Sequence, residues 1–161
     1  MAESGFKMPS VGRRIGLAVR SAYSLEHMSV RANEFYKWGR ALENEEKRTG
    51  KFHVAAKMFG RILDRAKREG RGGQPDYRIY GAYYVRALIM EACAREKSGE
   101  EIKAGELYKK AAAKATELGW DEKNFYRHFS GASEEFMPTE KEAADRLFQE
   151  MEKGRRRAKE G

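Results

Sequence analysis

Basic side chains at helical spacing are the feature of this sequence best suited to binding chemistry. Lys57, Arg61, Arg65 and Arg68 follow i, i+4, i+8 and i+11, which keeps them on one side of a helix. Lys and Arg bind phosphates and release counterions, so these residues are candidate contacts for RNA or a ribonucleoprotein. The candidate nucleic-acid contacts also include five arginines near the two ends of the chain: Arg13, Arg14, Arg155, Arg156 and Arg157. The alternative is that these cations belong to solvated helix faces in a charge-rich protein.

The charge of the chain is distributed unevenly. The 161 residues carry a net charge of +8. Residues 1–75 hold 16 Lys and Arg against 8 Asp and Glu, whereas residues 76–161 hold 17 of each. This asymmetry favours an anionic partner. No RNA-recognition signature is present in the sequence, so any RNA binding would depend on the phosphate backbone or on shape.

Arg48 and His53 are separated by four residues. This spacing resembles that of the HEPN-type ribonucleases, which are helical, and the resemblance implies an Arg and a His that activate a ribose hydroxyl and stabilise the phosphate. Gly50 lies between the two residues, where we expect a turn, and Arg20 and His27 have a similar gap. We therefore expect a protein that is not an enzyme, with no catalytic residue. We also predict no cofactor and no metal ligand, because the three histidines lie on separate segments and there is one cysteine.

The elements that position these residues are predicted to be helices. The chain is 36% charged and 40% hydrophobic and has three prolines, which suits long uninterrupted helices. The apolar spacing and the helix-end signals predict helices from Ser24 to near Gly50, over 51–70, 76–97 and 98–120, over 121–136, and from a capping box at Thr139 and Glu142 to about 153. The predicted inward positions include Trp38 or Gly39, Leu42, Ile102, Phe125, Phe129, Phe136 and Phe148.

The predicted helix over 76–97 is apolar on nearly every face between Ile79 and Ala94, so we expect neighbours on both sides of it. Arg86 and Glu91 interrupt this run, which is also too short to cross a bilayer. The first 23 residues lack the continuous apolar core of a signal peptide. We therefore expect a cytoplasmic protein with no membrane insertion.

A small residue followed four positions later by an aromatic one recurs along the chain. A shift of 49 residues places Gly50 on Gly99, and Ala55 and Phe59 on Ala104 and Tyr108. A further shift of 40 places Ala144 and Phe148 on the same pair. A small residue lets a neighbouring helix approach closely, and the ring fills the gap one turn along. The repetition predicts three helix pairs, which together bury apolar surface that one pair alone would leave exposed.

At these residues the chain resembles the tetratricopeptide repeat family, and Trp38-Gly39 stands where the family's first helix tends to have Leu-Gly. The resemblance covers roughly residues 30–153, with repeats longer than the family's 34 residues and without its repeat-ending proline. It implies an all-α fold of antiparallel helical hairpins stacked as a short right-handed solenoid of about six helices. The alternative is a plain antiparallel bundle. The predicted parts are a basic N-terminal segment, 1–22, a repeat domain, 23–153, with hairpins over 24–70, 76–119 and 120–153, and a basic tail, 154–161.

The same resemblance implies a concave surface, lined by the first helix of each hairpin, that binds a peptide or a partner helix. The residues expected there are Lys37, Arg40, Tyr83 and Arg86. The leading functional prediction is a non-catalytic adaptor for a protein or peptide partner, with RNA or ribonucleoprotein binding as the alternative. A homo-oligomer is also compatible with the sequence, because a stack without a polar end repeat leaves apolar surface uncovered.

Overall fold

The computed structural model describes residues 24–124 and 137–161, and every regular element in these two ranges is a helix. The helices are α2 (Leu25–Ala41), α3 (Glu45–Arg68), α4 (Pro75–Lys97), α5 (Glu101–Glu117) and α7 (Pro138–Glu160). The predicted all-α class is therefore confirmed over the described ranges. The predictions for residues 1–22, including Arg13 and Arg14, and for Phe125, Phe129 and Phe136 fall outside them.

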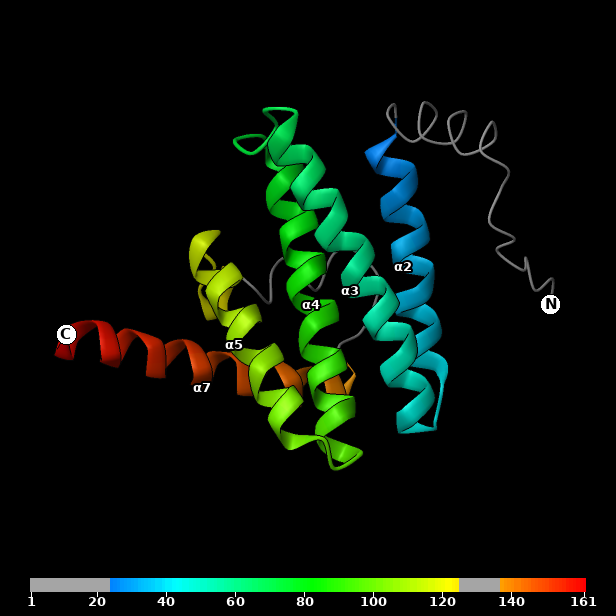
Figure 1. Ribbon diagram of the computed structural model, residues 1–161, viewed down its shortest axis with the longest axis vertical. Helices are drawn as coiled ribbons and strands as arrows, with labels where there is room; N and C mark the ends of the chain where they lie inside the picture. The colour runs from blue at the N-terminus through cyan, green and yellow to red at the C-terminus, as the bar shows by residue number, and fades with distance from the viewer. Residues whose placement is uncertain (1–23, 125–136) are drawn as a thin grey trace.

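Helices α2 to α5 run up and down side by side, and α7 lies across α4 and α5 (Figure 1). Each of α2, α3, α4 and α5 packs against the next along the chain, and α7 packs against both α4 and α5. Helix α4 therefore has α3, α5 and α7 as neighbours. Its residues from Val85 to Ala94 are all buried, as the apolar sequence of this helix predicts.

The first helix ends earlier than the sequence suggested. Ser24 caps α2 as predicted, its hydroxyl accepting a hydrogen bond from the His27 amide at 3.0 Å. The chain then turns at 42–44, and Asn44 caps α3 by accepting from the Lys47 amide at 3.0 Å. The expected turn at Gly50 was wrong, because Asn44 starts a helix that continues through Gly50. Gly50 therefore lies inside a helix, whereas Gly99 lies at a helix end, and the two glycines do not occupy equivalent positions.

Three helices end in the same way. Gly70, Gly99 and Gly119 have φ values of +73°, +85° and +71°, the left-handed conformation that glycine adopts without strain. The residue after each glycine donates its amide to a carbonyl five positions earlier: Arg71 to Ala66, Glu100 to Arg95, and Trp120 to Ala115. This is the Schellman motif, and it confirms the predicted ends of α3, α4 and α5 at these glycines.

Small residues set the distances between helices. A Cβ at Gly39 would lie 2.8 Å from the Phe52 ring, so α2 and α3 approach closely there. A Cβ at Gly81 of α4 would collide with Leu118, which follows α5. The predicted alanines Ala55, Ala104 and Ala144 are also fully buried. These contacts require glycine or alanine at the helix crossings.

The aromatic partners of those alanines have different surroundings. Phe59 is buried, with its ring centre 5.6 Å from that of Tyr83 on α4. Tyr108 is also buried, but the guanidinium of Arg146 on α7 lies 5.2 Å from its ring centre. Phe148 is only partly buried. The burial of the three alanines therefore agrees with the predicted repeat, whereas the burial and the neighbours of the three rings differ from one another.

Several finer predictions about inward positions and helix ends were wrong. Ile102, predicted to face inward, is 83% exposed. Of the two alternatives Trp38 and Gly39, Gly39 is the buried residue and Trp38 is 43% exposed. Helix α7 begins at Pro138, and the carboxylate that returns to its first turn belongs to Glu140, which accepts from the Met137 amide at 3.2 Å. The capping box predicted at Thr139 and Glu142 does not form. The predicted tail, 154–161, is part of α7 up to Glu160.

Candidate functional site

A groove of about 610 Å³ lies over α4, between α3 and α5. Its apolar lining comes from all three helices: Ala56, Gly60, Tyr84, Leu88 and Leu107. A Cβ at Gly60 would lie 3.3 Å from the Tyr84 ring, so this glycine lets the ring pack against α3. The groove thus has aliphatic and aromatic surface available between two helical walls.

Cations stand on both walls of this groove. Lys57 and Arg61 line it from α3, one turn apart, and Lys103 and Lys110 line it from α5, two turns apart. All four are exposed. Within the described ranges, no ion pair joins Lys57, Arg61 or Lys110 to an acidic side chain, so their charges face solvent. The acidic lining residues are Asp64, Glu91 and Glu106.

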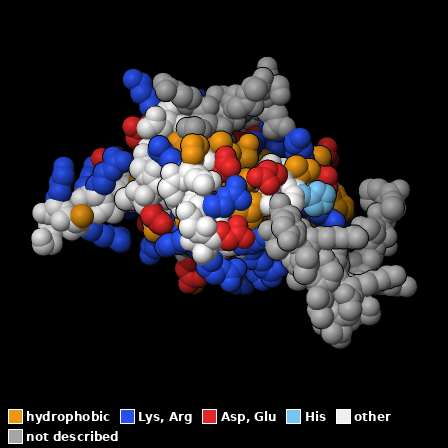
Figure 2. All heavy atoms as spheres, turned by 90° about the horizontal axis from the view of Figure 1, so that it is seen from above, with side chains coloured by type: hydrophobic (Ala, Val, Ile, Leu, Met, Phe, Trp, Pro, Cys, Tyr) orange, Lys and Arg blue, Asp and Glu red, His pale blue; other side chains and the backbone are white. Residues whose placement is uncertain are grey.

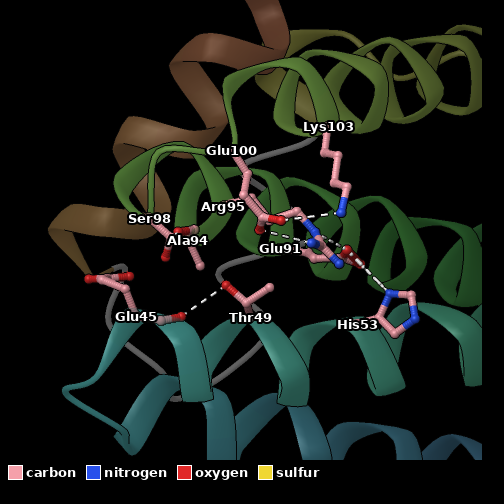
Figure 3. A network of polar contacts seen from close by, with 9 residues as sticks. All are labelled: Glu45, Thr49, His53, Glu91, Ala94, Arg95, Ser98, Glu100 and Lys103. Atoms are coloured by element: carbon pink, nitrogen blue, oxygen red, sulfur yellow. Dashed lines mark hydrogen bonds and ion pairs between the residues drawn. The ribbon is translucent and has the colours of Figure 1, made fainter.

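A polar network closes one end of the groove (Figure 3). Its centre is Glu91 of α4, whose side chain is only 3% exposed. His53 Nδ1 lies 3.0 Å from Glu91 Oε1, and Arg95 Nε donates to Glu91 Oε2 at 2.8 Å. Arg95 also donates to Glu100 at 3.0 Å, and Glu100 pairs with Lys103 at 3.3 Å. The network thus ties α3, α4 and the start of α5 together.

The charges of this network are stabilised by their partners. Burial alone would lower the pKa of Arg95, but its hydrogen bonds to Glu91 and Glu100 raise that pKa above its usual value. The hydrogen bond from Lys103, and that from Arg95, lower the pKa of Glu100. Arg95 and Glu100 therefore stay charged at neutral pH. The His53 side chain is 42% exposed, so its other ring nitrogen can bind a ligand in the groove.

Arg48 and His53 do not meet at one site. Both lie on α3, which removes the objection that a turn at Gly50 separates them. Arg48 is buried, and its Nε donates to the Gly39 carbonyl of α2 at 3.2 Å. His53 instead faces Glu91 of α4. Five residues rotate a helix by about 500°, which leaves the two side chains about 140° apart around its axis.

The four residues predicted to line a binding surface do not share one environment. Lys37 is exposed on α2, and Tyr83 is partly buried against Phe59. Arg40 and Arg86 both bind a carboxylate on α7, and Arg86 is buried. A buried Arg with an internal partner does not face a ligand. The predicted set is therefore not a common surface, and the groove between α3 and α5 replaces it as the candidate site.

That carboxylate belongs to Glu140, whose side chain is 2% exposed. Its Oε2 accepts from the Tyr36 hydroxyl at 2.5 Å and from two nitrogens of Arg86 at 3.0 and 2.6 Å. Its Oε1 pairs with Arg40 at 2.8 Å. Burial alone would raise the pKa of Glu140, but the charge of Arg86 and the hydrogen bond from Tyr36 lower it below its usual value. The cluster fastens α7 to α2 and α4.

The predicted basic stripe of α3 divides between two sides. Lys57 and Arg61 stand on the groove wall, and Arg68 is exposed near the end of the helix. Arg65 turns toward α2, where its guanidinium lies 3.5 Å from the sulfur of Met28, and it also pairs at 3.0 Å with Glu69 at the end of its own helix. The remaining predicted cations within the described ranges, Arg155, Arg156 and Arg157, are exposed on α7.

Other chemistry finds little support in the described ranges. No group of three His, Cys, Asp or Glu side chains there could hold a metal ion. Cys93 is a buried free thiol whose pKa is raised by burial, which disfavours the reactive thiolate. None of the described helices combines the length and the apolar character needed to cross a membrane.

No protein-family model matches the sequence, and neither a curated protein nor a solved structure matches it.

Proposed function

We propose that this protein is a non-catalytic helical adaptor that holds an acidic, partly apolar segment of a partner protein in the groove between α3 and α5. The observation that carries the proposal is the combination of an apolar floor with cations on both walls. Leu107 is partly exposed and supplies apolar contact area above a floor that includes the buried Leu88, and Lys57 and Lys110 face solvent from opposite walls. Opposite charges across such a surface accelerate association and select against basic partners.

The dimensions of the groove favour a short helical segment. Lys103 and Lys110 are seven residues apart on α5, which corresponds to about 10 Å along the helix axis. About two turns of a partner helix fit this length, with its apolar side chains against Leu107 and its carboxylates near the lysines. A contact this small belongs with weak, transient interfaces, so we expect a dissociation constant in the range of about 1–100 µM.

The tetratricopeptide-like arrangement is part of the same proposal. Helices α2 and α3 would form the first hairpin and α4 and α5 the second, and α7 would belong to the third. The packing of α3 on α4 and the buried alanines Ala55, Ala104 and Ala144 support stacking of successive hairpins. The proposed groove differs from the surface that the family resemblance implies, because α3 and α5 form its walls and only α4 contributes a first helix.

Fluorescence anisotropy with a labelled 16-residue amphipathic peptide tests the proposed function. The peptide carries leucines on one face and glutamates on the other, and a second peptide replaces each glutamate by lysine. We expect the acidic peptide to bind at least tenfold more tightly than the basic one. The double variant Lys57→Glu, Lys110→Glu should lose at least tenfold in affinity for the acidic peptide.

A matched control has the same net charge but leaves the groove intact. Lys47 and Lys109 are exposed on α3 and α5 and do not line the groove. The variant Lys47→Glu, Lys109→Glu should therefore bind the acidic peptide within about threefold of the parent protein, since charges at a distance act weakly at physiological salt. Equal losses in the two double variants, or equal binding of the two peptides, would disprove binding in the groove.

A further inference from the structure

The last part of α7 extends beyond the packed body of the protein. Met151 is the last buried residue, and every residue from Glu152 to the end of the chain is exposed. The helix nevertheless continues to Glu160, which adds about 13 Å at 1.5 Å per residue. This extension, 152–161, projects from the body at the left of the view (Figure 1). Core packing therefore does not explain its length.

The extension is strongly basic. It carries five cations against two carboxylates: Lys153, Arg155, Arg156, Arg157 and Lys159 against Glu152 and Glu160. Arg156 pairs with Glu152 at 3.3 Å, and Lys153 pairs with Glu150 at 3.7 Å. Among the described residues, no acidic side chain pairs with Arg155, Arg157 or Lys159. Lys and Arg side chains also dominate the projecting end in the space-filling view (Figure 2).

The chemistry of the extension selects among possible anionic partners. Ala158 is its only residue with an apolar side chain, so it lacks the large apolar or aromatic anchor that protein interfaces and membrane-bound helices use. Three consecutive arginines point in directions about 100° apart and cover more than half of the helix circumference. Their guanidinium groups match the two oxygens of a phosphate. No Asn or Gln is present to read adenine edges.

From these observations we propose that residues 153–159 of α7 bind the phosphate backbone of nucleic acid without reading its sequence. The site is separate from the groove, since Lys57 and Lys110 are not part of it. Each phosphate contact contributes a slope of about −0.9 to a plot of log K against log salt concentration on a duplex. The three cations without ion pairs therefore predict a slope of about −2.7 or steeper.

The test measures binding of labelled 20-base-pair RNA and DNA duplexes, and of a single strand, at several salt concentrations. The parent protein should bind both duplexes at 50 mM salt with little dependence on sequence. The triple variant Arg155→Gln, Arg156→Gln, Arg157→Gln should bind at least tenfold more weakly and lose about 2 to 3 from the salt slope. Its far-ultraviolet circular dichroism and melting temperature should match those of the parent, because all three side chains are exposed.

The matched control replaces three exposed lysines elsewhere, Lys47, Lys109 and Lys141, by Gln, which gives the same net charge. It should keep the parent's duplex affinity within about threefold and its salt slope within about one. Absence of duplex binding at 50 mM salt, or equal losses in the two triple variants, would overturn the proposal. Loss of duplex binding in Lys57→Glu, Lys110→Glu, with none in the α7 variant, would assign the site to the groove instead. Peptide binding is measured separately, so each proposal can fail alone.

Discussion

Removal of the Glu140 side chain should destabilise this protein more than removal of any exposed carboxylate. Glu140→Ala removes the carboxylate that pairs with the buried Arg86 and accepts from the Tyr36 hydroxyl. Breaking a buried ion pair by deleting one partner costs about 3–5 kcal/mol. A domain of this size loses about 2–4 °C of melting temperature for each kcal/mol, so we expect a decrease of roughly 6–20 °C.

The assay is urea and thermal unfolding followed by circular dichroism at 222 nm, with Glu142→Ala as the matched control. Glu142 lies on the same helix and pairs with Lys97 at 3.5 Å, with both side chains partly exposed. Such pairs contribute about 0–1 kcal/mol, so the control should unfold almost as the parent does. A loss of less than 1 kcal/mol for Glu140→Ala, or equal losses for the two variants, would refute the claim that this cluster fastens α7.

Further predictions concern pH and glycine. Because the folded pKa of Glu140 is lowered, the advantage of the parent over Glu140→Gln in urea unfolding should be complete above about pH 5, begin to decline near the unfolded pKa of 4.5, and be lost as the pH falls through the lower folded pKa; a constant difference from pH 6 to pH 3 would contradict this. Gly81→Ala should cost about 1–3 kcal/mol in thermal unfolding through its collision with Leu118, whereas Gly105→Ala, where a Cβ meets nothing, should stabilise α5 by about 0.5–1 kcal/mol. Gly99→Ala should cost about 1–2 kcal/mol, because its φ of +85° is strained for alanine; an unchanged melting temperature would disprove this.

Helix ends were predictable where one local signal was dominant. Gly99 and Gly119 flank α5, and α4 and α5 each stop within two residues of one of them. The segment 42–50 offers two signals, because Asn44 can start a helix and Gly50 can end one. In the structure the helix starts after Asn44 and continues through Gly50, since Glu45 and Glu46 in its first turn add favourable interactions with the helix dipole. A glycine inside a helix costs only about 1 kcal/mol, which packing of α3 offsets.

The candidate site was only partly predictable. Lys57 and Arg61 are about 40° apart around α3, and the helical spacing places them on one wall. Arg65 is about 80° from Lys57, far enough around the helix to face α2 instead. The pairing of Arg86 with Glu140 joins residues 54 positions apart, and no periodicity in the sequence specifies it. Buried ionic contacts of this kind depend on the tertiary arrangement of the helices.

The hydrogen bond from Tyr36 to Glu140 spans 104 positions of the chain and joins the first described helix to the last. An open-ended array keeps its two terminal units apart, so it can grow by duplication of an internal unit. In this protein, an extra hairpin inserted between α3 and α4 would separate Tyr36 from Glu140. This contact therefore constrains how many helices can lie between α2 and α7, and a version with an added hairpin there would lose the bond to the buried acid.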